Sequence, residues 1–298
     1  MTGLIVKAIS GFYYCSSEGQ IYECRGRGSF RNDEIIPLVG DHVEFDPSAA
    51  GGFVTKILPR KNEFTRPPMA NLDRLFIVAS VKKPFPNPLV IDKLTAVCEH
   101  KGIEPVIVIT KTDLGETGEL ETIYRKAGYP VLALDNREAD KAELYKIKDL
   151  TRGKISAFCG NTGVGKSSLL NNLFPSLNLQ TGDISRKLGR GRHTTRTVEL
   201  YPVGEPGTYV ADTPGFGTMD LQQYGTIRKD ELADCFPEFV PFLGKCRFTG
   251  CSHTSEKGCA VLEGLREGAI AASRFESYCA LYNQAKQIKE WEIEKEKR

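Results

Sequence analysis

The sequence has no large excess of either charge and no long apolar run. Its 298 residues hold 40 Lys and Arg against 38 Asp and Glu, a net charge of +2. No global basic field therefore demands nucleic acid, and any such binding must come from local patches. The apolar runs, of which residues 106–109 are typical, are too short for a membrane span. The first residues lack a basic segment followed by an apolar core, so we expect neither a secretory signal nor a membrane partner.

The nine cysteines are an odd number, which argues for reduced thiols and a metal site and against a disulfide framework. Cys246, Cys251, His253 and Cys259 have the spacing C-x4-C-x-H-x5-C. Three thiolates and an imidazole form a closed tetrahedral set for one structural Zn²⁺, with no open position for catalysis. The alternative is a set of unligated thiols. The remaining cysteines are typical of core residues: Cys15, Cys24, Cys98, Cys159, Cys235 and Cys279.

Residues 1–65 alternate short apolar strands with glycine turns, which predicts a small all-β barrel of OB or SH3-like type. Arg25, Arg27 and Arg31 fall in one segment between strands together with Phe30. A basic loop with an aromatic suits RNA, and a solvated surface loop explains the same residues equally well.

Residues 66–225 alternate strands and helices, which predicts an α/β domain with a parallel sheet wrapped by helices. Ligands of such sheets bind at the carboxyl ends of the strands. The expected strands are 75–79, 105–109, 131–134, 155–159, 198–203 and 208–211, and the expected helices are 89–100, 120–127, 144–150 and one that begins near 168.

Residues 226–298 contain the cysteine-rich loop and then a long helical stretch from about residue 266 to the end. We expect a C-terminal α-helical zinc-binding domain whose last residues, 290–298, fray. One apolar stripe runs along the helix: Phe275, Tyr278, Leu281, Tyr282, Ala285 and Ile288.

A phosphate-binding loop is predicted between an apolar strand and a helix. Its residues fit G-x-x-x-x-G-K-[ST]: Gly160, Asn161, Thr162, Gly163, Val164, Gly165, Lys166 and Ser167. The glycines permit a tight turn whose N–H groups face phosphate oxygens, and the helix N-terminus favours an anion. Lys166 would neutralise the β- and γ-phosphates, and the Ser167 hydroxyl would hold Mg²⁺. The alternative is a glycine-rich turn that happens to precede Lys-Ser.

Thr110, Lys111, Thr112 and Asp113 fit the guanine-recognition motif [NT]-K-x-D at the end of an apolar strand. The Asp113 carboxylate can accept hydrogen bonds from guanine N1–H and the N2 amine, a donor pair that adenine lacks. The aliphatic part of Lys111 would pack over the base.

A D-x-x-G motif, Asp212 to Gly215, follows another predicted strand. Asp212 would hold Mg²⁺, usually through a water, and the Gly215 N–H would meet the γ-phosphate. A turn that ends the strand is the alternative, since Asp, Pro and Gly all favour turns.

A basic, glycine-rich segment, residues 185–196, lies where a switch threonine is needed, and Thr194 or Thr195 could cap Mg²⁺ there. A solvated loop is the alternative. Phe216 occupies the position of a water-orienting glutamine, so hydrolysis needs another group. The nearest candidate is His193, which could instead contact RNA or pack. The catalytic residues proposed from sequence are therefore His193, Thr195 and Lys166.

The order of these motifs is circularly permuted, because Asp113 precedes Gly160. The chain leaves Gly215 directly for the C-terminal region, so nucleotide state should bias the position of that region. This is a hypothesis that hydrogen exchange can test.

Together these motifs resemble the RsgA (YjeQ/YloQ) family of GTPases, through G-N-T-G-V-G-K-S-S-L, G-R-H-T-T-R, D-T-P-G-F and the cysteine–histidine spacing. The resemblance covers nearly the whole chain. It implies a cytoplasmic bacterial GTPase that binds the small ribosomal subunit and its rRNA late in maturation and is stimulated by it. It also implies GTP contacts at residues 110–113, at 160–167 and at Ser168, and zinc on the Cys₃His set. The fifth GTPase motif departs from the family at residues 134–136, where no contact can be assigned.

The leading hypothesis is thus a GTP-hydrolysing enzyme, a monomer that uses Mg²⁺ with GTP and returns GDP. An RNA-binding scaffold with a passive guanine-nucleotide site is the alternative, and it would show no stimulation of turnover by small subunits. An ATP-dependent kinase is a third possibility, against which Asp113 argues.

Overall fold

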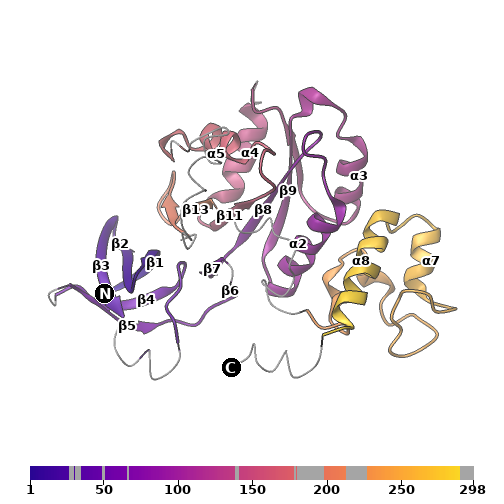
Figure 1. Ribbon diagram of the computed structural model, residues 1–298, viewed down its shortest axis with the longest axis horizontal. Helices are drawn as coiled ribbons and strands as arrows, with labels where there is room; N and C mark the ends of the chain where they lie inside the picture. Colours follow the sequence, from indigo (N-terminus) through magenta and orange to yellow (C-terminus); the bar gives the residue numbers. More distant parts are fainter. Residues whose placement is uncertain are drawn as a thin grey trace.

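The computed structural model describes residues 1–26, 30, 35–48, 51–65, 67–137, 141–177, 179, 198–212 and 227–288. A barrel, a six-stranded sheet with helices on both faces and a C-terminal helical region follow one another along the chain (Figure 1). No helix in these ranges combines the length and the apolar character that a membrane crossing requires.

Five strands close into the N-terminal barrel in the order β1-β2-β3-β5-β4, as predicted for an OB-type domain. Because β4 pairs with β1, the barrel has no open edge. Alternation along the strands turns Ile5, Cys15 and Val43 fully into the interior. The strands are β1 (Thr2–Ile9), β2 (Phe12–Ser17), β3 (Gln20–Gly26), β4 (His42–Asp46) and β5 (Phe53–Ile57).

The barrel packs against the outer edge of the sheet. Lys7 of β1 forms a bridge with Glu199, and its Nζ lies 3.0 Å from the Glu199 carboxylate. Ser16 Oγ lies 3.3 Å from the hydroxyl oxygen of Tyr209. A hairpin that the sequence analysis did not predict, β6 (Glu63–Thr65) with β7 (Pro68–Ala70), comes between barrel and sheet along the chain.

The sheet has the strand order β10-β9-β8-β11-β13-β12. The five strands from β10 to β13 are parallel, as predicted, but β12 pairs antiparallel with β13, which corrects the expectation of a wholly parallel sheet. A short connection joins β12 to β13, so the two form a hairpin at the edge. The strands are β8 (Arg74–Ser80), β9 (Glu104–Thr110), β10 (Val131–Leu134), β11 (Ile155–Cys159), β12 (Leu200–Pro202) and β13 (Tyr209–Asp212).

Helices cover both faces of this sheet, as the continuous apolar strands predict. On one face, side chains such as Ile77 belong to the same apolar cluster as Leu94 of α2 and Tyr124 of α3. On the other face, Phe76 and Val78 pack with helices α4 and α5. The helices are α2 (Pro88–Lys101), α3 (Gly118–Lys126), α4 (Lys141–Thr151) and α5 (Lys166–Leu173), and a 3₁₀ turn, Pro175–Leu177, follows α5.

The C-terminal region contains two helices where one long helix was expected from about residue 266. The first, α7 (Ala260–Arg266), ends before Gly268, whose φ of +72° is left-handed. The second, α8 (Ala272–Ala285), buries Tyr278, Leu281 and Ala285 of the predicted stripe. Two 3₁₀ turns, Leu232–Cys235 and Val240–Phe242, precede them, and residues 289–298 lie outside the described part.

A buried ion-pair network joins α8 to α2, which lie side by side (Figure 1). Arg274 is fully buried, and its guanidinium lies 2.9 Å from Asp92 and 2.6 Å from Glu238. Burial alone would lower the pKa of Arg274, but its two carboxylate partners raise that pKa above the ordinary value. The two ends of the network are 182 residues apart in sequence, so it fastens the C-terminal region to the sheet.

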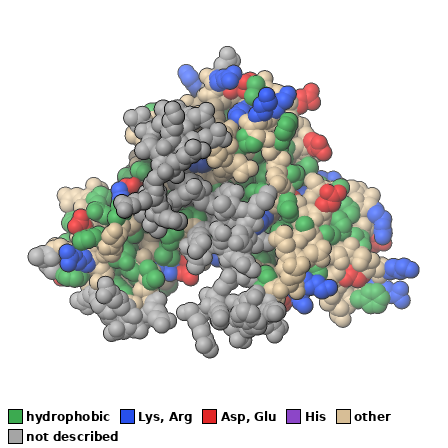
Figure 2. Space-filling model, viewed as in Figure 1, with side chains coloured by type: hydrophobic (Ala, Val, Ile, Leu, Met, Phe, Trp, Pro, Cys, Tyr) green, Lys and Arg blue, Asp and Glu red, His purple; other side chains and the backbone are tan. Residues whose placement is uncertain are grey.

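The visible surface carries both signs of charge. Figure 2 shows Lys and Arg side chains next to Asp and Glu side chains over the top of the sheet region and over the C-terminal region. This mixture agrees with the near-neutral composition.

Candidate nucleotide site and metal centre

The predicted phosphate loop lies between β11 and α5, the strand-loop-helix context that its motif requires. Two glycines permit its path. A Cβ atom on Gly160 would lie 2.4 Å from the Val78 carbonyl oxygen, and one on Gly165 would lie 2.7 Å from Asn136 Nδ2. Gly165 also has a φ of +91°, which disfavours any side chain. Larger residues at either position would displace the loop.

Three successive carbonyl groups of this loop accept hydrogen bonds from side chains at the ends of β9 and β10. Lys111 Nζ donates to Gly163 O at 2.6 Å, and Thr110 Oγ1 donates to Val164 O at 2.5 Å. Asn136 Nδ2 donates to Gly165 O at 3.0 Å. With its carbonyls held outward, the loop can turn N–H groups toward an anion.

The predicted guanine motif follows β9 at the same edge of the sheet. Thr110 is fully buried, Lys111 has a left-handed φ of +60°, and Thr112–Leu114 form a 3₁₀ turn. The Asp113 carboxylate remains partly accessible and lies 3.5 Å from the Arg137 guanidinium. The structure therefore brings this motif and the phosphate loop together, although about 50 residues separate them in sequence.

The segment after β10 lies at the predicted site, and sequence reasoning could assign no contact to it. Asn136 contacts the phosphate loop through its side chain, and its carbonyl oxygen accepts from Asn172 Nδ2 of α5 at 2.9 Å. Arg137 faces Asp113. A usable signal did exist, because β9 and β10 were both predicted as parallel strands and the ends of adjacent parallel strands meet at one edge.

Lys166 and Ser167 begin α5, and Ser168 follows them in its first turn. Burial lowers the pKa of the Lys166 ammonium to about 8, which the nearby Cys159 thiol opposes. A bound phosphate would reverse this effect by supplying negative charge.

The described residues include only some of the predicted magnesium ligands. Asp212 ends β13, and its backbone pairs in register with Phe158 of β11, so it reaches the sheet edge beside the phosphate loop. Oxygen donors such as Ser167 and Asp212 suit Mg²⁺. The other residues predicted for this part of the site, His193, Thr194, Thr195 and Gly215, lie outside the described residues.

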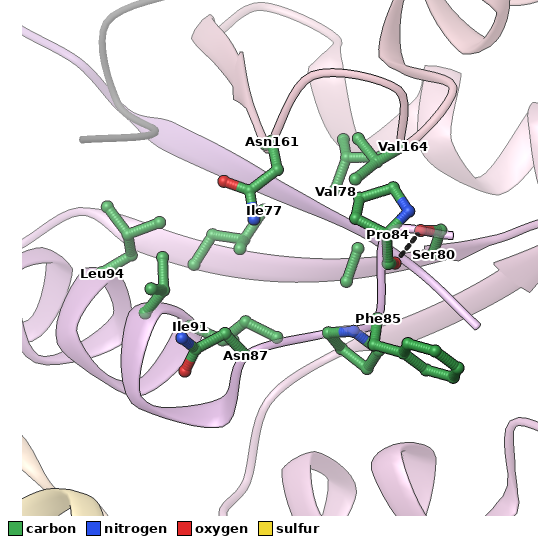
Figure 3. Close-up of a pocket in the computed structure, with 14 residues that line it drawn as sticks. Ile77, Val78, Ser80, Pro84, Phe85, Asn87, Ile91, Leu94, Asn161 and Val164 are labelled. Carbon is green, nitrogen blue, oxygen red and sulfur yellow. Dashed lines mark hydrogen bonds between the residues drawn. The ribbon is translucent and has the colours of Figure 1, made fainter. Parts of the chain in front are cut away.

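A cavity of about 30 Å³ lies behind the phosphate loop, between β8 and the start of α2 (Figure 3). Ile91 and Leu94 line it on the helix side, and Asn161 and Val164 line it on the loop side. Such a volume holds a water molecule or two, so it is no nucleotide pocket. The two segments predicted to bind a nucleotide, residues 110–113 and 160–167, meet instead at the sheet edge.

The Cys₃His set gathers into one cluster, with its four donor atoms within 4.8 Å of one another. Cys246 Sγ lies 3.8 Å from Cys259 Sγ, and each lies 3.5 Å from His253 Nδ1. A tetrahedral Zn²⁺ with bonds of about 2.3 Å to sulfur and about 2.0 Å to nitrogen would separate its ligands by about 3.8 and 3.5 Å. The donor set and its spacing therefore fit zinc, with Cys251 as the fourth ligand.

The loop that carries these ligands is held by Glu256. Its carboxylate accepts from the N–H groups of Ser252, Thr254 and Ser255 and from the Ser252 hydroxyl. These bonds lower the pKa of Glu256 to about 2, although partial burial acts in the other direction. The Tyr278 hydroxyl of α8 donates to the Ser252 carbonyl at 2.9 Å, so the cluster is fixed to the helix behind it.

Comparison with known proteins shows which family has this architecture. The model of the RsgA GTPase family matches residues 57–222, and that of the RsgA N-terminal domain matches residues 2–52. The small ribosomal subunit biogenesis GTPase RsgA of Caldanaerobacter subterraneus subsp. tengcongensis is 44% identical over 300 residues, which cover 99% of this chain and 97% of the relative.

Two solved structures have the same fold over almost the full length. The crystal structure of YjeQ from Thermotoga maritima superposes with a TM-score of 0.80 at 32% identity, covering 97% of this chain and 99% of that one. YloQ, described as a circularly permuted GTPase, gives a TM-score of 0.77 at 34% identity, covering 97% and 96%. With one family model spanning more than half of its residues and relatives matched end to end, this chain belongs to the RsgA family of circularly permuted GTPases.

Proposed function

We propose that this protein is a GTP-hydrolysing switch that binds the small ribosomal subunit and assists its late maturation, with hydrolysis stimulated by the subunit. The observation that carries the nucleotide part is the contact between the guanine motif and the phosphate loop, through Thr110 and Lys111. The small ribosomal subunit enters from relatives such as the RsgA of Caldanaerobacter, whose name states that role.

In this proposal one pocket accommodates the whole nucleotide. Asp113 accepts from the guanine base and Lys111 packs along it, while residues 160–167 and Ser168 surround the phosphates. Lys166 neutralises the β- and γ-phosphates. The proposal is supported by the three side-chain hydrogen bonds to carbonyl groups of the phosphate loop. These bonds hold the loop at the sheet edge that carries the guanine motif.

Asn136 and Arg137 serve as the fifth element of the site. Asn136 fixes the C-terminal end of the phosphate loop against α5. Arg137 lies beside the carboxylate that would select guanine.

Magnesium would be held by Ser167, Asp212 and a switch threonine, for which Thr195 is our choice over Thr194. Bound there, Mg²⁺ neutralises charge on the β- and γ-phosphates. With Phe216 in the position of the usual glutamine, His193 is the group that we propose to orient water. A structural Zn²⁺ would be bound by Cys246, Cys251, His253 and Cys259. It would not be catalytic, because four protein ligands leave no open position.

Further parts of the proposal concern organisation. We propose an RNA-binding barrel at 1–65, the GTPase domain at 66–225 and the zinc-binding helical domain at 226–298. We also propose that the protein acts in the cytoplasm as a monomer.

The deciding experiment measures GTP turnover and cosedimentation with purified small and large ribosomal subunits, in GDP and in a non-hydrolysable GTP analogue. We expect faster turnover with small subunits alone, and cosedimentation that depends on the nucleotide. Cosedimentation without any change in turnover would instead identify an RNA-binding scaffold with a passive nucleotide site. Large subunits serve as the matched control for charge-driven RNA binding.

A further inference from the structure

The loop between β8 and α2 is unusually restrained for a surface segment. Three prolines, Pro84, Pro86 and Pro88, fix backbone φ at alternate positions. Ser80 Oγ donates to the Pro84 carbonyl at 2.7 Å. Lys111 Nζ donates to the Lys83 carbonyl at 2.6 Å. The prolines and these two hydrogen bonds therefore restrict the loop before any partner binds.

This rigid loop presents an aromatic ring to solvent. Phe85 is 69% exposed, and in Figure 3 its ring points away from Ile91 and Leu94. Lys82 and Lys83 precede Phe85 with one proline between and have exposed side chains, and residues 81–91 contain no acid. A single exposed apolar side chain is ordinary, but here it is preorganised and next to two cations.

We propose that Phe85, Lys82 and Lys83 form an RNA contact, in which Phe85 stacks on an unpaired base and the lysines neutralise the adjoining phosphates. Aromatic rings beside cations are the usual means of binding single-stranded RNA, because every base offers a face for stacking. The two lysines favour an anionic partner, and the exposed ring beside them favours an anion with stackable bases over an acidic protein surface. The inference rests on the proposed function, which supplies the RNA.

The contact lies next to the nucleotide site. The Lys111 ammonium that holds the Lys83 carbonyl also holds Gly163 of the phosphate loop. A Cβ atom on Gly163 would lie 3.8 Å from Pro84 Cδ. RNA bound at Phe85 would therefore contact a segment that lies next to the phosphate loop. We expect loss of this RNA contact to reduce both subunit binding and subunit-stimulated turnover.

The test uses the full chain in cosedimentation and turnover assays with small subunits. F85A and F85L should each weaken subunit binding about tenfold, the size expected for one stacked base, whereas F85W should bind at least as well as the unaltered protein. Basal turnover and GDP affinity should not change. Y145A is the matched control, because Tyr145 is 64% exposed on α4, and it should bind normally. Equal binding by F85A and the unaltered protein overturns the inference, and full binding by F85L points to an apolar protein partner and overturns it too.

Two further measurements separate the classes of partner. The double variant K82A/K83A should reduce the slope of log affinity against log salt by about 1.4, or about 0.7 per phosphate contact. Phe85→p-benzoylphenylalanine should crosslink to RNA on irradiation, and crosslinks to protein alone contradict the proposal. If the unaltered chain fails to bind small subunits, both the proposed function and this contact are contradicted. Normal binding that is insensitive to position 85 removes the contact and leaves the function intact.

Discussion

At the scale of single residues, the clearest question concerns how the Asp113 carboxylate selects a base. In the described structure it has an accessible oxygen and an arginine, Arg137, 3.5 Å away. The arginine lies on one side of the carboxylate without enclosing it. A carboxylate that is open on one side suits a ligand edge with two adjacent donors.

Replacement of Asp113 by asparagine should exchange the preferred base. The Asn amide offers one acceptor and one donor, which matches xanthine, where a carbonyl oxygen replaces the guanine amine. We expect D113N to lose GDP affinity by on the order of 100-fold and to gain XDP affinity, measured by fluorescent-nucleotide displacement. D135N, a change in an acid near the site with no assigned base contact, is the control. Undiminished GDP binding by D113N contradicts the assignment of the base.

Nucleotide affinity should fall as pH rises above about 8. Burial sets the Lys166 pKa to about 8, and bound phosphate raises it, so binding is coupled to proton uptake. Affinity is therefore full below pH 8 and declines by up to about tenfold per pH unit above it. Calorimetry of GDP binding in two buffers of different ionisation enthalpy will measure the proton uptake that accompanies binding. K166M should bind weakly and without this pH dependence, and an equal slope in K166M refutes the linkage to Lys166.

Residue-level prediction from sequence was possible where a motif has a spacing tied to one chemistry. Residues 110–113 and 160–167 were recognised because each has a spacing that few other functions require. Asn136 was missed because Leu-Asp-Asn matches no motif, and its role depends on the distance to Gly165, which only the folded chain defines.

At the scale of elements, the attachment of α8 to α2 is the feature that sequence could not reveal. The apolar stripe of α8 predicted a buried face but not its partner. The helix expected from about residue 266 begins only at Ala272, because the left-handed Gly268 follows the end of α7 and separates the two helices. Likewise, alternation predicted a strand near β12 but not its direction, which is determined by the short connection to β13.

Removal of the Arg274 guanidinium should loosen the C-terminal region. R274M leaves the carboxylates of Asp92 and Glu238 buried without their cation, which destabilises by about 3–5 kcal/mol. Native-state hydrogen exchange of α8 amides measures this change locally. R228M is the control, since the Arg228 pair with Asp230 is about half exposed and contributes at most about 1 kcal/mol. Equal protection of α8 in both variants contradicts the role of the network.

Loss of one ligand of the metal centre should release zinc. C259S should lower zinc content from one ion per chain to none, measured by mass spectrometry under native conditions, because three remaining donors bind far more weakly. C279S is the control, because Cys279 is a half-buried cysteine of α8 outside the cluster. A retained ion in C259S rules out this ligand set.

At the scale of the whole molecule, the permuted order determines how nucleotide state could reach the C-terminal region. The chain continues from β13, which ends at the predicted nucleotide site, toward the region that α8 fastens to α2. The order of motifs was visible in the sequence, so the permutation was predictable. The packing of the regions was not, because contacts between distant segments leave no local pattern.

Residues 227–288 should therefore differ in amide protection between the GDP state and a GTP-analogue state. We expect the largest change near residue 227 and a smaller one in α8, which the buried network restrains. Hydrogen exchange with mass spectrometry measures both, and the barrel strands serve as the internal reference. Identical protection of 227–288 in the two states excludes this coupling.

The contact between the barrel and strand β12 has a consequence for self-association. β12 is the last strand of the sheet, and its free side would offer unpaired N–H and C=O groups to another molecule. The Lys7–Glu199 bridge and the nearby barrel wall occupy that side. The barrel thus acts as a cover that keeps one molecule's sheet from adding to another's, and a version trimmed of it would be prone to stack edge to edge.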